Sequence, residues 1–138
     1  MNPTLQLPNL CSDARAQWNS SPKPGYLNQL PHHWISGIHA PAWVELSFGS
    51  NFATIYQVLA NVDQGNPGFR VDQVLVMLEN AHDYQQVDLW IGERVQNDQV
   101  KSHLHHAIPR VKSLRIETTC LTNNWVGWYS IQVLGFLT

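Results

Sequence analysis

The feature of this sequence that most constrains its fold is the alternation of apolar and polar side chains in residues 113–136. Two alternating runs flank an Asn-Asn-Trp loop at residues 123–125. Alternation with a period of two indicates β-strands that each bury one face. The expected core side consists of Leu114, Ile116, Thr118 and Cys120 in the first run and Tyr129, Ile131 and Val133 in the second. The expected outer side consists of Arg115, Glu117 and Thr119, then Trp128, Ser130 and Gln132.

Strand patterns continue through most of the chain. We expect strands at residues 43–48, 53–63, 70–79, 87–95, 111–121 and 128–136, with a further strand near 11–18. No segment keeps an apolar residue at every third or fourth position between caps, so helix content should be small. Short strands separated by turn residues predict an all-β, antiparallel β-sandwich or barrel.

The same alternation assigns faces to three of the earlier strands. Val44, Leu46 and Phe48 form one expected core stripe, and Tyr56, Val58, Ala60 and Val62 form a second. A third stripe comprises Val87, Leu89 and Ile91, which places Trp90 outward beside Asp88. Residues 74–78 are apolar on both faces, which predicts a strand that is covered on both sides.

Length and charge narrow the function classes. The 138 residues are expected to form one domain, residues 1–138. The net charge is −2, and charged residues make up only 13% of the chain, so a nucleic-acid partner is not expected. No apolar run approaches the ~18 residues of a membrane span. Residues 1–10 lack a basic start and a continuous apolar run, which predicts a cytoplasmic chain or part of a larger exported protein.

Two cysteines permit one disulfide bond at most. The alternation places Cys120 on the core face, where a buried free thiol is the usual outcome. The alternative is a bridge between Cys11 and Cys120 on neighbouring strands.

The chain resembles the discoidin or coagulation-factor type C family, whose galactose-binding-like jelly rolls include many carbohydrate-binding modules. The resemblance covers about residues 12–136 and rests on the order of four segments: 30–37, 43–49, 55–64, and the final pair 114–117 with 127–135. It implies a jelly-roll sandwich. The acidic loop that precedes the family's tryptophan is replaced here by residues 26–31, which have no carboxylate. Because calcium prefers carboxylate oxygens, we expect neither calcium nor another cofactor.

The family binds ligands with loops at one end of the sandwich. By this resemblance, three loops should meet there, and the expected ligand is a carbohydrate. An aromatic ring can cover the apolar C–H face of a sugar, while amides and carboxylates bind its hydroxyls. Asn and Asp are also common in turns because they bond their own backbone, and Trp125 could instead cap the core. The expected ligand-binding residues are Tyr26, Asn28, His32, His33, Asp63, Gln64, Asn66, Asn123, Asn124 and Trp125.

Other functions have weaker support. His103, His105 and His106 lie close together, but no Cys or Glu at ligand spacing joins them, so a solvated surface is expected rather than a metal site. No nucleophile or phosphate-loop motif is present, and the carboxylates are scattered, so catalysis is not expected. The main alternative to carbohydrate binding is a protein-interaction module of the same fold.

Apolar side chains on expected outer faces predict self-association. Ile55 and Leu59, Leu75 and Met77, and Trp90 all lie opposite core stripes. If neighbouring strands line these side chains up, the patch exceeds the few hundred Å² that monomers usually expose, which favours a homodimer. The alternative is that the N-terminal residues or the 96–110 connection cover this face.

Overall fold

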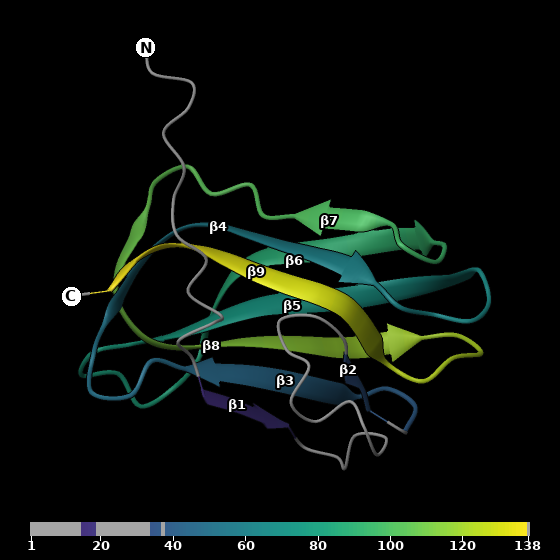
Figure 1. Cartoon of the computed structure of the whole chain (residues 1–138), viewed down its shortest axis with the longest axis horizontal. Coiled ribbons are helices and arrows are strands. Elements are labelled where there is room, and N and C mark those ends of the chain that lie inside the picture. The colour runs from purple at the N-terminus through teal and green to yellow at the C-terminus, as the bar shows by residue number, and fades with distance from the viewer. Residues whose placement is uncertain (1–14, 19–33, 37, 138) are drawn as a thin grey trace.

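The computed structural model describes residues 15–18, 34–36 and 38–137. Within these residues every regular element is a strand, and all pairs are antiparallel (Figure 1). The strands are β1 (Arg15–Trp18), β2 (Trp34–Ile35), β3 (Ala42–Ser47), β4 (Ala53–Val62), β5 (Gly68–Leu78), β6 (Gln85–Arg94), β7 (Gln99–Lys101), β8 (Ile108–Leu121) and β9 (Gly127–Leu137). The strand predictions are therefore confirmed to within a few residues. Only β2 and β7 were missed, because two or three residues are too few to show alternation.

Hydrogen bonding arranges the strands in two layers. One layer has the order β1-β3-β8-β5-β6, and the other has the order β2-β9-β4-β7. The layers are joined where the beginning of β8 pairs with the beginning of β4. Neighbours in each layer are mostly distant in sequence, which is the connectivity of a jelly-roll β-sandwich and confirms the expected fold class. No helix in the described residues is long and apolar enough to cross a membrane.

The core lies between the layers and contains most of the predicted stripes. Its members include Val44, Leu46, Phe48, Val58, Ala60, Val62, Val74, Val76, Leu114, Ile116, Ile131 and Val133. Thr118 is also buried, as expected. The outer sides of β3 and β5 are half-buried rather than fully covered.

Two bulges reverse predicted faces on the β4–β9 pair. The register shifts between Ile55 and Gln57, so Ile55 is buried and Tyr56 is exposed. It shifts again opposite Tyr129, so Trp128 is buried and Tyr129 is exposed. The predictions for Tyr56, Tyr129 and Trp128 were wrong because an extra residue in one strand moves every later side chain to the opposite face.

A third bulge corrects the prediction for Cys120. Asp72 pairs with Thr118, but the preceding Val71 pairs with Cys120, which leaves one additional residue in β8. Cys120 is therefore exposed, and the expectation of a buried thiol was wrong. Cys11 lies outside the described residues.

The predicted faces of β6 are also reversed. Leu89 and Ile91 are exposed, Val87 is half-buried, and Trp90 is buried. Trp90 pairs with Asp72 across the sheet, and both side chains point inward. The large ring gains more from burial than the aliphatic side chains, and it packs edge-on against Trp128 with ring centroids 6.1 Å apart. Ile55 and Trp90 thus belong to the core and cannot contribute to an outer apolar patch.

Candidate functional site

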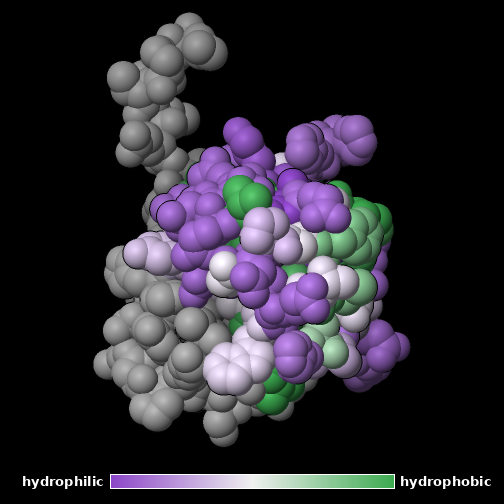
Figure 2. All heavy atoms as spheres, turned by 90° about the vertical axis from the view of Figure 1, so that its right-hand side faces the viewer, coloured by the Kyte–Doolittle hydropathy of each residue, from purple (hydrophilic) through white to green (hydrophobic). Residues whose placement is uncertain are grey.

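The loops at one end of the sandwich surround an open hollow of about 360 Å³. This end lies at the right of Figure 1, where the β4–β5 and β8–β9 connections turn, and it faces the viewer in Figure 2. Figure 2 shows a mostly hydrophilic surface there with few hydrophobic spots. The volume falls within the ~300–1,000 Å³ of typical ligand sites. The lining residues are His39, Asp63, Gln64, Gly65, Asn123, Asn124 and Trp125.

Asn124 joins the two main loops of the hollow. Its side-chain oxygen accepts a hydrogen bond from the Asn66 amide at 3.0 Å, and its side-chain nitrogen donates to the carbonyls of Asn66 at 2.9 Å and Thr122 at 3.0 Å. The preceding Asn123 has a φ of 61°, a left-handed conformation that asparagine tolerates better than most residues. Asn124 is buried, so its amide serves to hold the loops together.

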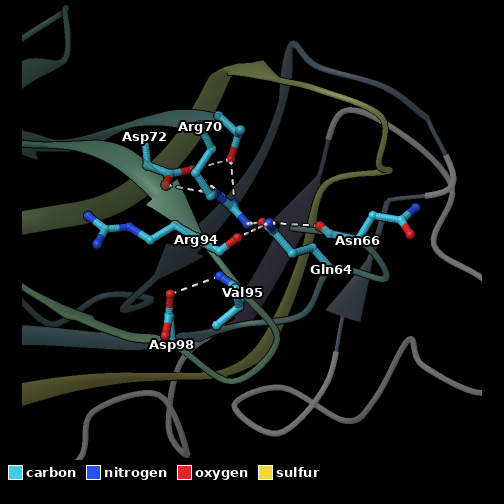
Figure 3. Close-up of polar contacts among 8 residues, drawn as sticks. Gln64, Asn66, Arg70, Asp72, Arg94, Val95 and Asp98 are labelled. Atoms are coloured by element: carbon cyan, nitrogen blue, oxygen red, sulfur yellow. Dashed lines mark hydrogen bonds and ion pairs between the residues drawn. The ribbon is translucent and has the colours of Figure 1, made fainter. Parts of the chain in front are cut away.

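The buried side chain of Gln64 fixes the β4–β5 loop to the rest of the sandwich (Figure 3). Its side-chain nitrogen donates to the carbonyls of Asn66 at 3.1 Å and Arg94 at 2.7 Å, and its side-chain oxygen accepts from Arg70 at 3.2 Å. Its backbone amide donates to the side chain of Gln96 at 2.7 Å. Because every polar group of this amide is bonded within the protein, Gln64 shapes the hollow from a buried position.

A buried ion pair supports Gln64. Arg70 and Asp72 lie on the same face of β5 with fully buried side chains, and the Arg70 Nε lies 2.9 Å from the Asp72 carboxylate. Thr118 donates to the same carboxylate at 2.5 Å, and the Arg70 guanidinium lies 4.4 Å from the ring centre of Trp128. The pair therefore connects β5, β8 and β9 to the loop. The sequence does carry a signal for this ion pair. Arg70 and Asp72 are opposite charges two positions apart, at the start of an apolar stripe.

His39 is a further lining residue that the sequence did not single out. Its Nδ1 lies 2.9 Å from the Asn124 carbonyl oxygen. Because a carbonyl only accepts hydrogen bonds, this nitrogen carries the hydrogen, and in the neutral ring Nε2 is an acceptor. His39 is exposed at the mouth of the hollow.

The remaining groups differ in chemistry. Trp125 is 42% exposed although it is a large aromatic residue. Asp63 is half-buried, and one of its oxygens accepts from Gln96 at 2.9 Å. The Asn123 side chain has no hydrogen-bond partner among the residues that the structure describes. The hollow thus combines an aromatic face with a carboxylate, an amide and an imidazole.

The structure gathers part of the predicted ligand-binding set. Asp63, Gln64, Asn123, Asn124 and Trp125 line one hollow, and Asn66 adjoins it through its bonds to Asn124. The other four predicted residues, Tyr26, Asn28, His32 and His33, lie outside the described residues. The ligand contacts of the whole set remain a prediction.

The histidines of the β7–β8 connection do not form a metal site within the described part of the chain. His103, His105 and His106 are exposed, and no cluster of three or more potential metal ligands occurs among the described residues.

Comparison with known proteins places the fold among carbohydrate-binding modules. No protein-family model and no curated protein sequence matches the chain. Solved structures do match it. One is a family 32 carbohydrate-binding module from a family 31 glycoside hydrolase of Clostridium perfringens, with a TM-score of 0.71, 12% identity, and coverage of 96% of this chain and 99% of that one.

Two further matches have similar coverage. The family 32 module of C. perfringens NanJ, in complex with galactose, has a TM-score of 0.70 and 11% identity over 94% of this chain and 98% of that one. A chitosan-binding module from a Paenibacillus sp. IK-5 chitosanase/glucanase has a TM-score of 0.68 and 16% identity, covering 93% and 99%. At these identities the likeness establishes the jelly-roll fold, and it leaves the ligand to be argued from the site.

Proposed function

We propose that this chain is a non-catalytic carbohydrate-binding module that holds its sugar in the loop-end hollow. The observation that carries the proposal is the 42% exposed ring of Trp125, which lines a hollow together with Asp63, Asn123 and His39. A pyranose presents an apolar C–H face and a rim of hydroxyls, and this set of groups complements both. Matching modules of the same fold include one in complex with galactose and one that binds chitosan, which supports the proposal.

The number of carboxylates that line the hollow favours binding without catalysis. Glycoside hydrolysis normally requires two carboxyl groups on either side of the scissile bond. Among the described residues that line the hollow, Asp63 is the single acidic side chain, and it accepts a hydrogen bond from Gln96. A bound sugar would therefore meet one carboxylate, which suits recognition of hydroxyls.

Buried groups give the hollow its rigidity. Gln64 and Asn124 have their amides bonded inside the protein, so they hold the loops before a ligand arrives. A preformed site loses less conformational entropy on binding. In this account Gln64 and Asn124 act as positioning residues, and the ligand contacts fall to Trp125, Asn123, Asp63 and His39.

A glycan array tests the function class directly. We expect the purified chain to bind at least one class of neutral glycan, and free sugar of the same class should compete. Absence of binding across an array of plant, bacterial and animal glycans would contradict the proposal and favour the protein-interaction alternative.

We also propose a homodimer, although the residues that support it differ from the predicted ones. Ile55 and Trp90 are buried, and Leu75 and Met77 lie in a different layer from Leu59, so the predicted residues do not form one patch. The support comes instead from the β4–β9 layer, where Leu59 is partly exposed and Tyr56 and Phe136 form an exposed edge-to-face pair. Light scattering at micromolar concentration should show a mass of twice 15.7 kDa. A single 15.7 kDa species that does not associate on concentration would rule the dimer out.

A further inference from the structure

A second hollow lies between the edge strands of the two layers. It has a volume of about 300 Å³ and shares no lining residue with the loop-end hollow. β6 pairs with β5 alone and β7 pairs with β4 alone among the described strands, so each contributes a free edge here. The lining residues are Leu89, Trp90, Ile91, Arg94, Gln99, Val100, Lys101 and His103.

The charge of this hollow is opposite to that of the first. Its formally charged lining residues are Arg94 and Lys101, whereas the loop-end hollow has Asp63. Arg70, Arg110 and Arg115 each form an ion pair with a carboxylate. Arg94 forms none with any described residue, and its Nε is buried without a hydrogen-bond partner among them. Lys101 likewise has no ion pair within the described residues.

The main chain of Arg94 supports the loop-end hollow, whereas its side chain lines the second hollow. Its main-chain carbonyl accepts the hydrogen bond from Gln64 at 2.7 Å, and its guanidinium points the opposite way (Figure 3). The guanidinium lies beside Gly92, where a Cβ atom would come within 3.8 Å of it. The guanidinium therefore lies close to the β6 backbone, and its donors have no anionic partner among the described residues.

Asp88, Glu93 and Asp98 each adjoin a lining residue in sequence, and none of them forms an ion pair with Arg94 or Lys101. The Asp88 carboxylate accepts hydrogen bonds from the Leu89 amide at 2.8 Å, the Trp90 indole at 3.1 Å and the His103 amide at 3.0 Å. It does not lie within ion-pair distance of Arg94 or Lys101 and does not line the hollow. The two cations are therefore available to an external anion.

We propose that this second hollow binds an acidic sugar unit. The carboxylate of such a unit would pair with Arg94, whose planar donors match carboxylate geometry, and with Lys101. Leu89 is 39% exposed and Ile91 is 53% exposed, and they offer aliphatic contact to the ring. The volume of about 300 Å³ is at the lower end of the range for ligand sites, which suits a compact sugar unit better than an extended peptide. The choice of a sugar rests on the proposed function, and the choice of an anion rests on the charges alone.

Calorimetric titration with a galacturonic acid trimer tests the second site, with the neutral galactose trimer as a matched ligand. Arg94→Gln and Lys101→Gln remove the charges but keep the main-chain carbonyls that accept from Gln64 and Trp90. Each should weaken uronate binding by at least about tenfold. Lys112→Gln, which removes an exposed charge outside both hollows, should leave it unchanged.

Chemical-shift changes on uronate addition should concentrate at residues 89–103. Uronate binding that is absent, or that survives both charge substitutions, would overturn the second site. Tighter binding of a glutamate-rich peptide at the same residues would overturn the choice of a sugar. A chain that binds neutral glycans but no uronate would keep the proposed function and lose only this inference.

Discussion

At the scale of single residues, the Arg70–Asp72 pair is a place where removing one partner should be strongly destabilising. Both side chains are fully buried, and removal of one member leaves an uncompensated charge in the core. We expect Asp72→Asn to lower the free energy of unfolding by roughly 3–5 kcal/mol. The double variant Arg70→Met/Asp72→Leu should recover much of this loss, because apolar residues of similar size often replace buried ion pairs without penalty. Urea denaturation of the three proteins measures both effects, and an Asp72→Asn cost below about 1 kcal/mol would contradict the account.

Tyr84 provides a second residue-level prediction, at alkaline pH. Its hydroxyl donates to Glu45 and lies 2.9 Å from Ser113, and its ring lies 4.4 Å from the Arg115 guanidinium. Partial burial raises the pKa of Tyr84 to about 12, and the hydrogen bond to Glu45 acts in the same direction. In the unfolded chain the pKa is near 10.

The sign of the effect follows from proton binding. Between pH 10 and pH 12 the folded state retains the Tyr84 proton that the unfolded state has lost, so stability falls as the pH rises. The stabilisation from this side chain is complete below pH 10. Tyr84→Phe should therefore be less stable than the wild type at pH 9, and the difference should shrink by pH 12. Urea midpoints at both pH values measure it, and a constant difference would show that Tyr84 does not titrate in this way.

At the scale of strands, the alternation predicted which segments form strands but could not place the bulges. Val44, Leu46 and Phe48 follow the simple pattern because β3 pairs with β8 without a register shift. The predicted faces of Tyr56, Cys120 and Tyr129 were wrong because each residue lies where the register between two paired strands shifts. A bulge depends on how two strands meet across the sheet, so one strand's sequence does not reveal it.

The bulge near Gly135 requires a residue without a Cβ atom, and this requirement can be tested. Gly135 pairs with Ile55, and a Cβ atom there would overlap the Thr54 main-chain carbonyl and come within 3.2 Å of the Ile55 Cα. Both obstacles are backbone, so the strands would have to separate. We expect Gly135→Ala to destabilise the protein by about 1–3 kcal/mol.

Gly65→Ala is the matched control for this substitution. The nearest atom to a Cβ at Gly65 is the Asn124 side-chain oxygen at 3.8 Å, an ordinary contact. Thermal unfolding should show a lower Tm for Gly135→Ala and an unchanged Tm for Gly65→Ala. Equal Tm values for the two variants would mean that the β4 and β9 backbones are less closely apposed than described.

At the scale of the whole molecule, the sandwich acts as a rigid support for loops that have little structure of their own. Polar loops and an exposed Trp125 indicated where to look for a site. The roles of Gln64 and Asn124 could not be predicted, because their partners lie 30 and 58 residues away in the chain. Sequence reasoning also missed His39, which reaches the hollow through a bond to the Asn124 carbonyl. Loop composition thus predicted the location of the site better than the role of each residue.

The central claim is that a sugar stacks on Trp125 in the loop-end hollow. Titration of the best neutral glycan into the wild type, Trp125→Ala and Tyr56→Ala tests it most directly. Tyr56 is a matched control because it is an exposed aromatic outside both hollows. Loss of one stacking ring should weaken binding by about tenfold in Trp125→Ala, and Tyr56→Ala should bind like the wild type. An unchanged Kd in a folded Trp125→Ala variant would contradict the account.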